Sequence, residues 1–284
     1  MKIKIITDSM GDIPKKIVDE LNIRIVPLTV NFEDKTYIDG IDISSKQFFE
    51  LLAISTIMPT TSQVTPATFH QVFEEELKSS DKLIVINGSS KLSGTYNSAT
   101  LAALEFDSDK IIVLDSTLVT FAQGYLVIKA ARMVKKGKSF EEIIKDVEYS
   151  KQRIRCLFAV DTLKYLLKGG RLSKMQAIAG SILNVKPILT IINGELKTIE
   201  KARGMKKALS FIEDFSESRG VKLEGKVIGI NHASSKDAAN KLEKAMKTRY
   251  KVKEVLRAEV GSVIGTHSGP GCVAMYFEEN NIII

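Results

Sequence analysis

The chain has 284 residues, 44% of them hydrophobic and 26% charged, and its formal net charge is +7. This composition is typical of a globular protein, and the length suggests about two domains. No apolar run approaches the roughly 20 residues that span a bilayer, and the N-terminal run is too short for a signal peptide, so we expect a cytoplasmic protein.

In the first half, short strand-like runs alternate with helix-like segments. The predicted strands are Ile3–Thr7, Ile23–Val30 with a break at Pro27, Lys82–Ile86 and Ile111–Leu114. The predicted helices begin near Pro14 or cover Pro66–Lys78, Gly94–Glu105 and Ala122–Lys136. This alternation predicts a parallel sheet in Rossmann-like layers, with ligands bound at the carboxyl ends of its strands.

A capping box at Ser139–Glu142 predicts a helix to about Gln152, and we place a domain boundary shortly afterwards. The predicted domains are residues 1–160 and 161–284. Asn193-Gly194 predicts a hairpin between Ile188–Ile192 and Glu195–Ile199. The other predicted elements are strands at Leu157–Val160, Val227–Ile230, Val252–Leu256 and Cys272–Phe277, and helices at Asp161–Lys168, Ser173–Leu183, Arg203–Ser218 and Ser235–Arg249. They predict a second α/β domain with a mixed sheet.

Two hydroxyl-rich loops, Thr60–Gln63 and Ser89–Thr95, are each followed by a predicted helix. Hydroxyls and free backbone N–H groups at helix starts suit an anion, and Gly94 allows a close backbone approach. We therefore predict that Thr61, Ser62 and Ser93 hold a negatively charged head group. The alternatives are that Ser93 is a simple helix N-cap and that the others are tight-turn hydroxyls.

The second half offers three further candidates for an anion site. His267 lies in the glycine-rich stretch Gly265–Gly271, which we expect to leave its imidazole exposed and able to donate to a carboxylate. Arg171 follows two glycines and Arg203 precedes Gly204, so either guanidinium could fork onto a carboxylate or phosphate. For each arginine alone, a solvated surface position is the simpler interpretation.

Several features are absent from the sequence. It contains no phosphate-binding P-loop, no dinucleotide-binding glycine motif and no Gly-x-Ser-x-Gly elbow. We therefore predict no catalytic residue and no cofactor. Cys156 and Cys272 form no CxxC pair and the three histidines lack ligand spacing, so we predict two reduced thiols and no metal.

Basic runs at Lys135–Lys138, Lys164–Lys174 and Lys201–Lys207 account for part of the net charge. They suit a solvated helix face, an acidic partner protein, a membrane surface or an anionic ligand. Few aromatic residues accompany them, so we expect no nucleic-acid binding. Two alternatives to a binding protein stay open: a stand-alone acyl or phosphate-ester enzyme that uses His267 as acid or base, and a basic nucleic-acid or regulatory module.

Five sets of strings, in order along the chain, together resemble the DegV family over essentially its full length. They are Thr7-Asp8-Ser9 with Asp12-Ile13-Pro14, Pro59–Gln63, Ser89–Tyr96, Leu163–Arg171 with Val185–Leu189, and His267–Gly271. The resemblance implies a protein that binds one long-chain fatty acid, with the acyl tail in a tunnel near the interface of its two domains.

The resemblance also implies roles for individual residues. The carboxylate would sit on Thr61 and Ser93, with Ser62, His267 and Arg203 as neighbours. Some family members present the fatty acid to a separate ATP-dependent kinase subunit, which makes acyl phosphate for phospholipid synthesis. Arg171, Arg203 and the adjoining basic runs would serve that docking, the acyl phosphate or a transient membrane-surface contact.

Three positions depart from the family's usual pattern. Val64-Thr65-Pro66 replaces Pro-Ser-Pro, Ala274 replaces a common glycine, and Phe121 stands in a segment that is usually rich in small residues. We expect the bulky Phe121 to reshape the pocket wall. The preference for chain length or unsaturation therefore does not carry over from the family.

Overall fold

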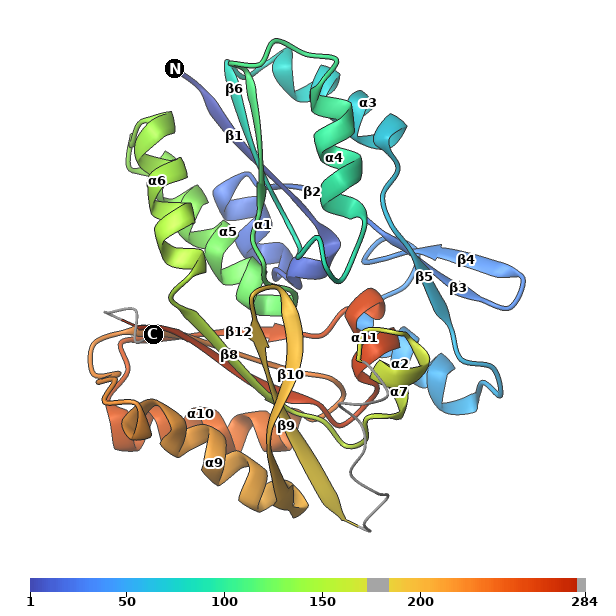
Figure 1. Ribbon diagram of the computed structural model, residues 1–284, viewed down its shortest axis with the longest axis vertical. Helices are drawn as coiled ribbons and strands as arrows, with labels where there is room; N and C mark the ends of the chain where they lie inside the picture. The colour runs from blue at the N-terminus through green and yellow to red at the C-terminus, as the bar shows by residue number, and fades with distance from the viewer. Residues whose placement is uncertain (173–183, 280–284) are drawn as a thin grey trace.

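The computed structural model of the protein describes residues 1–172 and 184–279, and the helix predicted at residues 173–183 lies outside them. Two sheet-containing layers stack along the long axis of the molecule (Figure 1). Each layer carries its own helices, and the chain passes from one to the other after residue 151. This arrangement confirms an α/β fold with two sheets.

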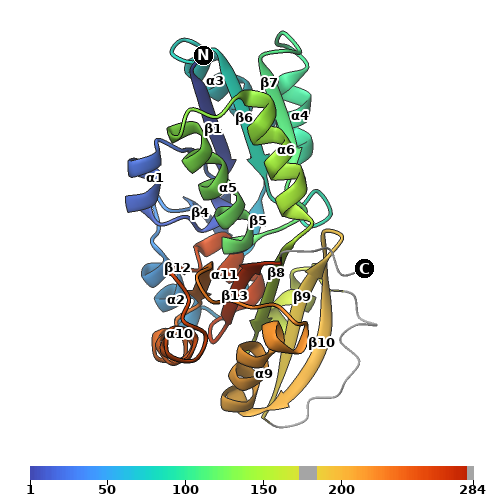
Figure 2. The same cartoon turned by 90° about the vertical axis from the view of Figure 1, so that its left-hand side faces the viewer.

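The first sheet is parallel, as predicted. Its strand order is β2-β1-β6-β7, with bounds β1 Ile3–Asp8, β2 Arg24–Val26, β6 Lys82–Asn87 and β7 Ile111–Asp115. Leu83, Ile84, Val85 and Ile86 are fully buried, because helices cover both faces of the sheet. Figures 1 and 2 show α3 (Pro66–Leu77) and α4 (Thr95–Ala103) on one face, and α1 (Lys15–Leu21), α5 (Thr120–Lys135) and α6 (Phe140–Lys151) on the other.

The second sheet is mixed, which confirms that prediction. Its order is β10-β9-β8-β13-β11-β12, and only β11 and β12 run parallel. The strands are β8 Ile154–Ala159, β9 Val185–Ile192, β10 Glu195–Arg203, β11 Val227–His232, β12 Glu254–Glu259 and β13 Val273–Glu278. The division between domains that we drew at residue 160 stays a prediction, but β8 already pairs within the second sheet.

The two faces of the second sheet have different partners. On β13, Val273, Met275 and Phe277 pack against α9 (Gly204–Ser218) and α10 (Lys236–Tyr250) in one hydrophobic core. Their strand neighbours Ala274 and Tyr276 point the opposite way, into the core shared with the first domain. The short helices α7 (Lys164–Lys168) and α11 (Ser262–Ser268) lie at this inner side (Figure 1).

A third, small sheet was not predicted. Strands β3 (Thr29–Phe32), β4 (Lys35–Ile38) and β5 (Thr60–Ser62) pair antiparallel, with α2 (Ser45–Ile54) between β4 and β5. The prediction that Thr60–Gln63 is a loop is therefore wrong for residues 60–62. The run is short and polar, so its strand conformation comes from pairing with β3 and not from a local pattern.

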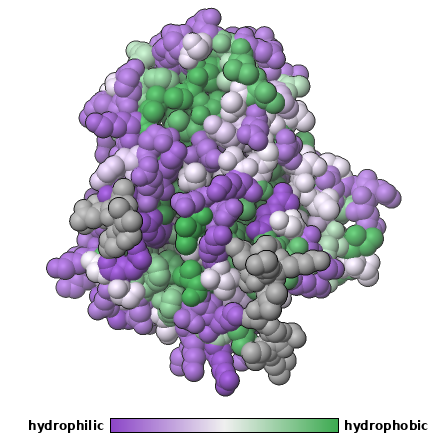
Figure 3. Space-filling model, in the orientation of Figure 1, coloured by the Kyte–Doolittle hydropathy of each residue, from purple (hydrophilic) through white to green (hydrophobic). Residues whose placement is uncertain are grey.

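An exposed apolar patch lies at the top of the molecule, away from the junction of the two layers (Figure 3). A surface groove there follows the edge strand β7 and is lined by Leu104, Phe106 and Ile112 among others. Leu104 is 77% exposed. Within residues 1–172 and 184–279, none of the helices combines the length and apolar character that crossing a lipid bilayer requires.

Candidate functional site

A buried cavity of about 160 Å³ lies between the first sheet's carboxyl edge, the small sheet and the inner face of the second sheet. Its volume is more than ten times the ~10–15 Å³ that one water molecule requires. Apolar side chains from both layers and their connecting loops form most of the wall: Met10, Leu28, Leu92, Val119, Phe158, Leu166, Leu196, Val260, Val263, Ile264, Cys272, Ala274 and Tyr276. The cavity is therefore a mostly apolar space between the two layers, larger than a packing defect.

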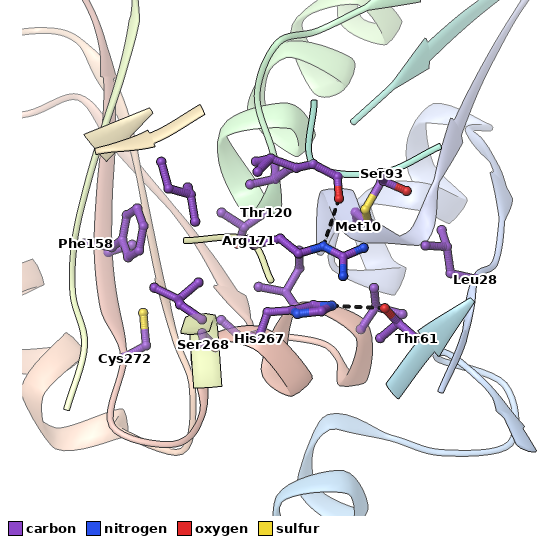
Figure 4. A pocket seen from close by; sticks show the side chains of 18 of the residues that line it. Met10, Leu28, Thr61, Ser93, Thr120, Phe158, Arg171, His267, Ser268 and Cys272 are labelled. Atoms are coloured by element: carbon purple, nitrogen blue, oxygen red, sulfur yellow. Dashed lines mark hydrogen bonds between the residues drawn. The ribbon is translucent and has the colours of Figure 1, made fainter. Parts of the chain in front are cut away.

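Four polar side chains gather at one side of this cavity, and we call them the polar cluster: Thr61, Ser93, Arg171 and His267. Figure 4 shows them grouped together, with Phe158 and Cys272 across the cavity from Ser93 and Thr61. Among the described residues that line the cavity there is no aspartate or glutamate. A cation, an imidazole and two hydroxyls without a carboxylate suit an anionic group.

Thr61 and His267 come from elements far apart in the chain. Thr61 pairs with Val30 across β5 and β3, and its Oγ1 lies 3.0 Å from Nε2 of His267. His267 stands in the last turn of α11, so the expectation of an exposed loop imidazole is wrong. Packing turns Gly265–Ser268 into helix, because α11 lies against Phe48 and Phe49 of α2.

Two buried aspartate side chains hold the first turn of α11. Asp12 accepts a hydrogen bond from the Gly261 N–H at 2.9 Å, and Asp39 accepts from both the N–H and the hydroxyl of Ser262. Side-chain oxygens at a helix N-terminus accept hydrogen bonds from N–H groups that have no partner within the helix. These contacts tie α11, and with it His267, to the first domain and the small sheet.

The imidazole of His267 is neutral at physiological pH. Burial and, to a smaller extent, the nearby Arg171 guanidinium lower its pKa from 6.5 to about 4. A helix C-terminus favours the charged form, but here desolvation is the stronger effect. Its Nδ1 is buried without a hydrogen-bond partner among the described residues. Neutral His267 can therefore donate from one ring nitrogen and accept at the other.

This lowered pKa predicts acid sensitivity. The unfolded imidazole binds a proton near pH 6.5 while the folded one does not until about pH 4, so stability is lost as pH falls through that window. Between pH 7.5 and pH 5, wild type should lose about 2 kcal/mol more unfolding free energy than His267→Gln. Urea unfolding of both ligand-free proteins at the two pH values measures this difference, and equal losses would contradict it.

Ser93 lies in a tight turn at the carboxyl end of β6. The N–H groups of Leu92 and Ser93 both donate to the Ser89 carbonyl, at 3.0 Å. The N-cap of α4 is Gly94 and not Ser93, although the Ser93 hydroxyl accepts from the Thr95 N–H at 3.3 Å. The simple N-cap interpretation of Ser93 therefore does not hold.

We expected Gly94 to allow a close backbone approach to a ligand, but its neighbour in the structure is the side chain of Gln63. A Cβ at Gly94 would lie 1.9 Å from Oε1 of Gln63, so the side chain of Gln63 occupies the space that glycine leaves open. Gln63 in turn donates to Ser98 at 3.0 Å and lines the cavity. Gln63 is thus a site residue that sequence reasoning included only as the end of a loop.

Arg171 lies at the centre of the polar cluster (Figure 4). Its Nε donates to the Leu92 carbonyl at 3.0 Å and its Nη1 to the Gly169 carbonyl at 2.7 Å. Desolvation lowers its pKa, but an arginine stays charged in a protein. Arg171 therefore brings positive charge to the cavity itself and connects the second half of the chain to the Ser89–Ser93 turn.

Gly169 allows His267 to take its position. A Cβ at Gly169 would lie 2.2 Å from Nδ1 of His267, whereas a Cβ at Gly170 would meet nothing within 4 Å. We expect Gly169→Ala to push the imidazole away from Thr61 and to return its pKa toward 6.5. Gly170→Ala is the matched control, since it adds only backbone strain at φ +71°. NMR titration of His267 measures the pKa, and an unchanged value in Gly169→Ala would contradict this packing.

Two candidates do not reach the cavity. Ser62 accepts a hydrogen bond from Asn31 at 3.1 Å in an exposed position, because strand alternation turns it away from Thr61. Arg203 is exposed at the far end of β10 from Leu196, seven residues along the strand or roughly 23 Å away. The structure therefore brings together Thr61, Ser93, Gly94, Arg171 and His267, but not these two.

The cavity lining also includes polar residues that sequence reasoning missed. Tyr276 donates to Asn231 at 2.7 Å, Asn231 donates to Thr120 at 2.7 Å, and all three line the cavity. Phe121 is not in the lining and packs edge-on behind Tyr276, with ring centroids 6.1 Å apart. Its predicted effect on the wall is thus indirect, through Tyr276.

The described residues contain no group of three or more histidine, cysteine, aspartate or glutamate side chains that could hold a metal ion. Cys156 and Cys272 are free and buried, and burial raises the pKa of the Cys272 thiol to about 12. A thiol with that pKa is a poor nucleophile at neutral pH.

Comparison with known proteins gives consistent matches over the whole chain. The family model described as "Uncharacterised protein, DegV family" matches residues 2–280. A DegV domain-containing protein of Caldanaerobacter subterraneus subsp. tengcongensis is 44% identical over 278 residues, which cover 98% of this chain and 99% of that protein.

Two solved structures are similar in fold and are described as fatty-acid-binding. A DegV family protein from Thermus thermophilus has a TM-score of 0.91 at 33% identity, over 98% of this chain and 100% of that one. DegV from Bacillus subtilis has a TM-score of 0.90 at 36% identity, over 99% and 100%. The sequence, the two-sheet fold and these matches agree, and the chain belongs to the DegV family.

Proposed function

We propose that this protein binds a single long-chain fatty acid, with the carboxylate at the polar cluster and the acyl tail in the apolar cavity. The observation that carries the proposal is the pairing of the two: a mostly apolar cavity with one charged, hydroxyl-rich side. Its similarity to DegV proteins described as fatty-acid-binding supports the same ligand class.

The energetics suit this ligand. Burying about 14 methylenes at roughly 0.8 kcal/mol each gives about 11 kcal/mol before association and ordering costs. A carboxylate buried without partners would cancel much of that gain. Thr61, Ser93 and His267 supply hydrogen-bond donors, and Arg171 supplies the positive charge.

Native mass spectrometry of protein purified from bacterial cells tests the ligand. We expect one added mass of a long-chain fatty acid per chain, released by denaturation and identified after lipid extraction. A known lipid carrier purified in parallel controls for loss during handling. If the carrier keeps its lipid and this protein holds no fatty acid, the proposed ligand is wrong.

We further propose that the protein is a binding subunit, which presents the carboxylate to a separate ATP-dependent kinase that forms the acyl phosphate. This part extends the resemblance of the chain to the family, and the position of the polar cluster beside a surface cleft supports it. Isolated protein incubated with ATP, magnesium and fatty acid should form no acyl phosphate, whereas adding a fatty acid kinase subunit should. Acyl phosphate from the isolated chain would contradict the role of binding subunit.

The stand-alone enzyme that uses His267 is the weaker proposal. The imidazole does contact the hydroxyl of Thr61 at 3.0 Å, as a base contacts a nucleophile. However, no described residue orients Nδ1, and a pKa of about 4 makes His267 a weak base. Hydrolysis of an acyl ester by the isolated chain, abolished in His267→Ala, would favour this alternative.

A further inference from the structure

Three buried side chains that do not belong to the polar cluster bring further polar atoms to the cavity wall. They are Thr120, Asn231 and Tyr276, and we call them the hydroxyl–amide patch. The Tyr276 hydroxyl donates to Oδ1 of Asn231, and Nδ2 of Asn231 donates to the Thr120 hydroxyl, both at 2.7 Å. The patch is thus a second polar feature of a mostly apolar cavity.

The strand register places this patch beside the expected path of the acyl chain. Asn231 on β11 lies directly opposite Ala274 on β13, and Ala274 lies directly opposite Phe158 on β8. Opposite residues on antiparallel strands share a face of the sheet, and their Cα atoms are about 4.5–5.5 Å apart. An acyl chain that lies against Phe158 and Ala274 therefore passes within reach of the Asn231 amide.

The patch is anchored from outside the cavity. Thr120 donates to Oδ2 of Asp12 at 2.7 Å, and Asp12 also accepts from the Gly261 N–H at 2.9 Å. Thr120 begins α5 with φ +54°, a left-handed conformation that is unfavourable for a β-branched residue. Such strained residues persist where their surroundings hold them, and they cluster at functional sites. The bonds to Asp12 and Asn231 thus fix the Thr120 hydroxyl at the wall before any ligand binds.

The patch keeps hydrogen-bonding capacity that the described residues do not use. The Asn231 amide has two N–H donors and two acceptor lone pairs, and within the described part of the chain its side chain makes one bond of each kind. The Tyr276 hydroxyl donates once and can still accept. A hydroxyl group on a ligand both donates and accepts, so it can pair with either residue, whereas a methylene can pair with neither.

We propose that the hydroxyl–amide patch recognises a hydroxyl group on the acyl chain, so that the cavity takes long-chain hydroxy fatty acids. This proposal rests on the proposed function, because the carboxylate held at the polar cluster determines which carbon reaches the patch. Two fixed polar points select one position of the hydroxyl along the chain. At any other position the buried hydroxyl loses its water partners, which lowers affinity by about tenfold to 100-fold.

A panel of 18-carbon acids with one hydroxyl each tests the proposal in the wild-type protein. The hydroxyl is moved from carbon 5 to carbon 16, which keeps it away from the carboxylate and its polar cluster. Displacement of a fluorescent fatty acid from delipidated protein gives each dissociation constant relative to that of stearate. We expect one position, or two adjacent ones, to bind within about threefold of stearate and the others at least tenfold more weakly. A similar loss at every position would overturn the proposal.

The double variant Asn231→Leu with Tyr276→Phe assigns the favoured position to the patch. It replaces both partners of one buried hydrogen bond by apolar groups of similar shape, which is far less destabilising than removing one. We expect the dissociation constant of the favoured hydroxy acid, divided by that of stearate, to rise at least tenfold. Taking this ratio removes any general change in binding, and an unchanged ratio would overturn the proposal.

Thr190→Val is the matched control for the double variant. It removes a buried hydroxyl that donates to the Cys156 carbonyl at 2.7 Å in the same sheet, from a residue outside the cavity lining, so its ratio should equal that of wild type. If the double variant does not fold, the wild-type panel still decides the question. If wild type binds neither stearate nor any hydroxy acid, the proposed function fails instead.

Discussion

Replacing Ala274 by phenylalanine should abolish retention of a 16-carbon fatty acid while the protein stays folded. Ala274 lines the cavity from β13, where it pairs with Phe158 on one side and Asn231 on the other, and it is 1% exposed. A ring at this position projects into the cavity. Each methylene that it excludes costs about 0.8 kcal/mol of binding, so excluding four lowers affinity by about 200-fold.

The thermal stability of the ligand-free variant separates this result from simple misfolding. A ring forced into a packed core destabilises a protein, whereas a ring that enters empty space does not. We therefore expect Ala274→Phe to melt at or above the temperature of ligand-free wild type, and Ala274→Ser to retain fatty acid. Isothermal titration with 16-carbon and 8-carbon acids should show that Ala274→Phe loses more binding affinity, relative to wild type, for the longer acid. Unchanged affinity for the 16-carbon acid would place the tail elsewhere.

Removing both hydroxyls of the polar cluster should have the next largest effect. Each hydrogen bond to a charged group contributes about 1.5–3 kcal/mol, so Thr61→Ala combined with Ser93→Ala should weaken binding at least 100-fold. The two effects are not strictly additive, because both hydroxyls would serve one carboxylate. The binding affinity for the methyl ester of the same fatty acid should fall much less from wild type to the double variant, because the ester carries no charge.

Lys136→Ala is the matched control for the double variant. Lys136 is exposed at the end of α5, so its replacement removes a positive charge far from the cavity lining. Retention should be measured by lipid extraction after identical purification of the three proteins. If the double variant keeps as much fatty acid as Lys136→Ala, the assignment of the head-group site is wrong.

The sequence predicted the parts of the fold that local patterns determine. Lys82–Ile86 contains the continuous apolar run Leu83–Ile86, which is typical of a strand buried on both faces, and the Asn193-Gly194 pair predicts a hairpin. The small sheet was missed because Thr60–Ser62 is polar and becomes a strand only against β3. Helix α11 was missed because its glycines favour a loop, and contacts with α2 and the buried Asp12 and Asp39 stabilise it instead.

The site was predicted in part for a related reason. Thr61, Ser93, Arg171 and His267 lie beside turns and glycines, which mark functional segments in a sequence. Arg203 has the same local signal, yet it lies at the opposite end of a nine-residue strand. The apolar wall gave no signal at all, since Phe158, Leu196 and Ala274 look like ordinary core residues. Only the packing of two sheets against each other leaves space between them.

A crystal structure of the protein loaded with palmitate tests the central claim most directly. The account predicts the carboxylate within about 3 Å of the Thr61 and Ser93 hydroxyls, and the acyl chain in the cavity against Phe158 and Ala274. A carboxylate that faces solvent, or a chain bound outside this cavity, would contradict it.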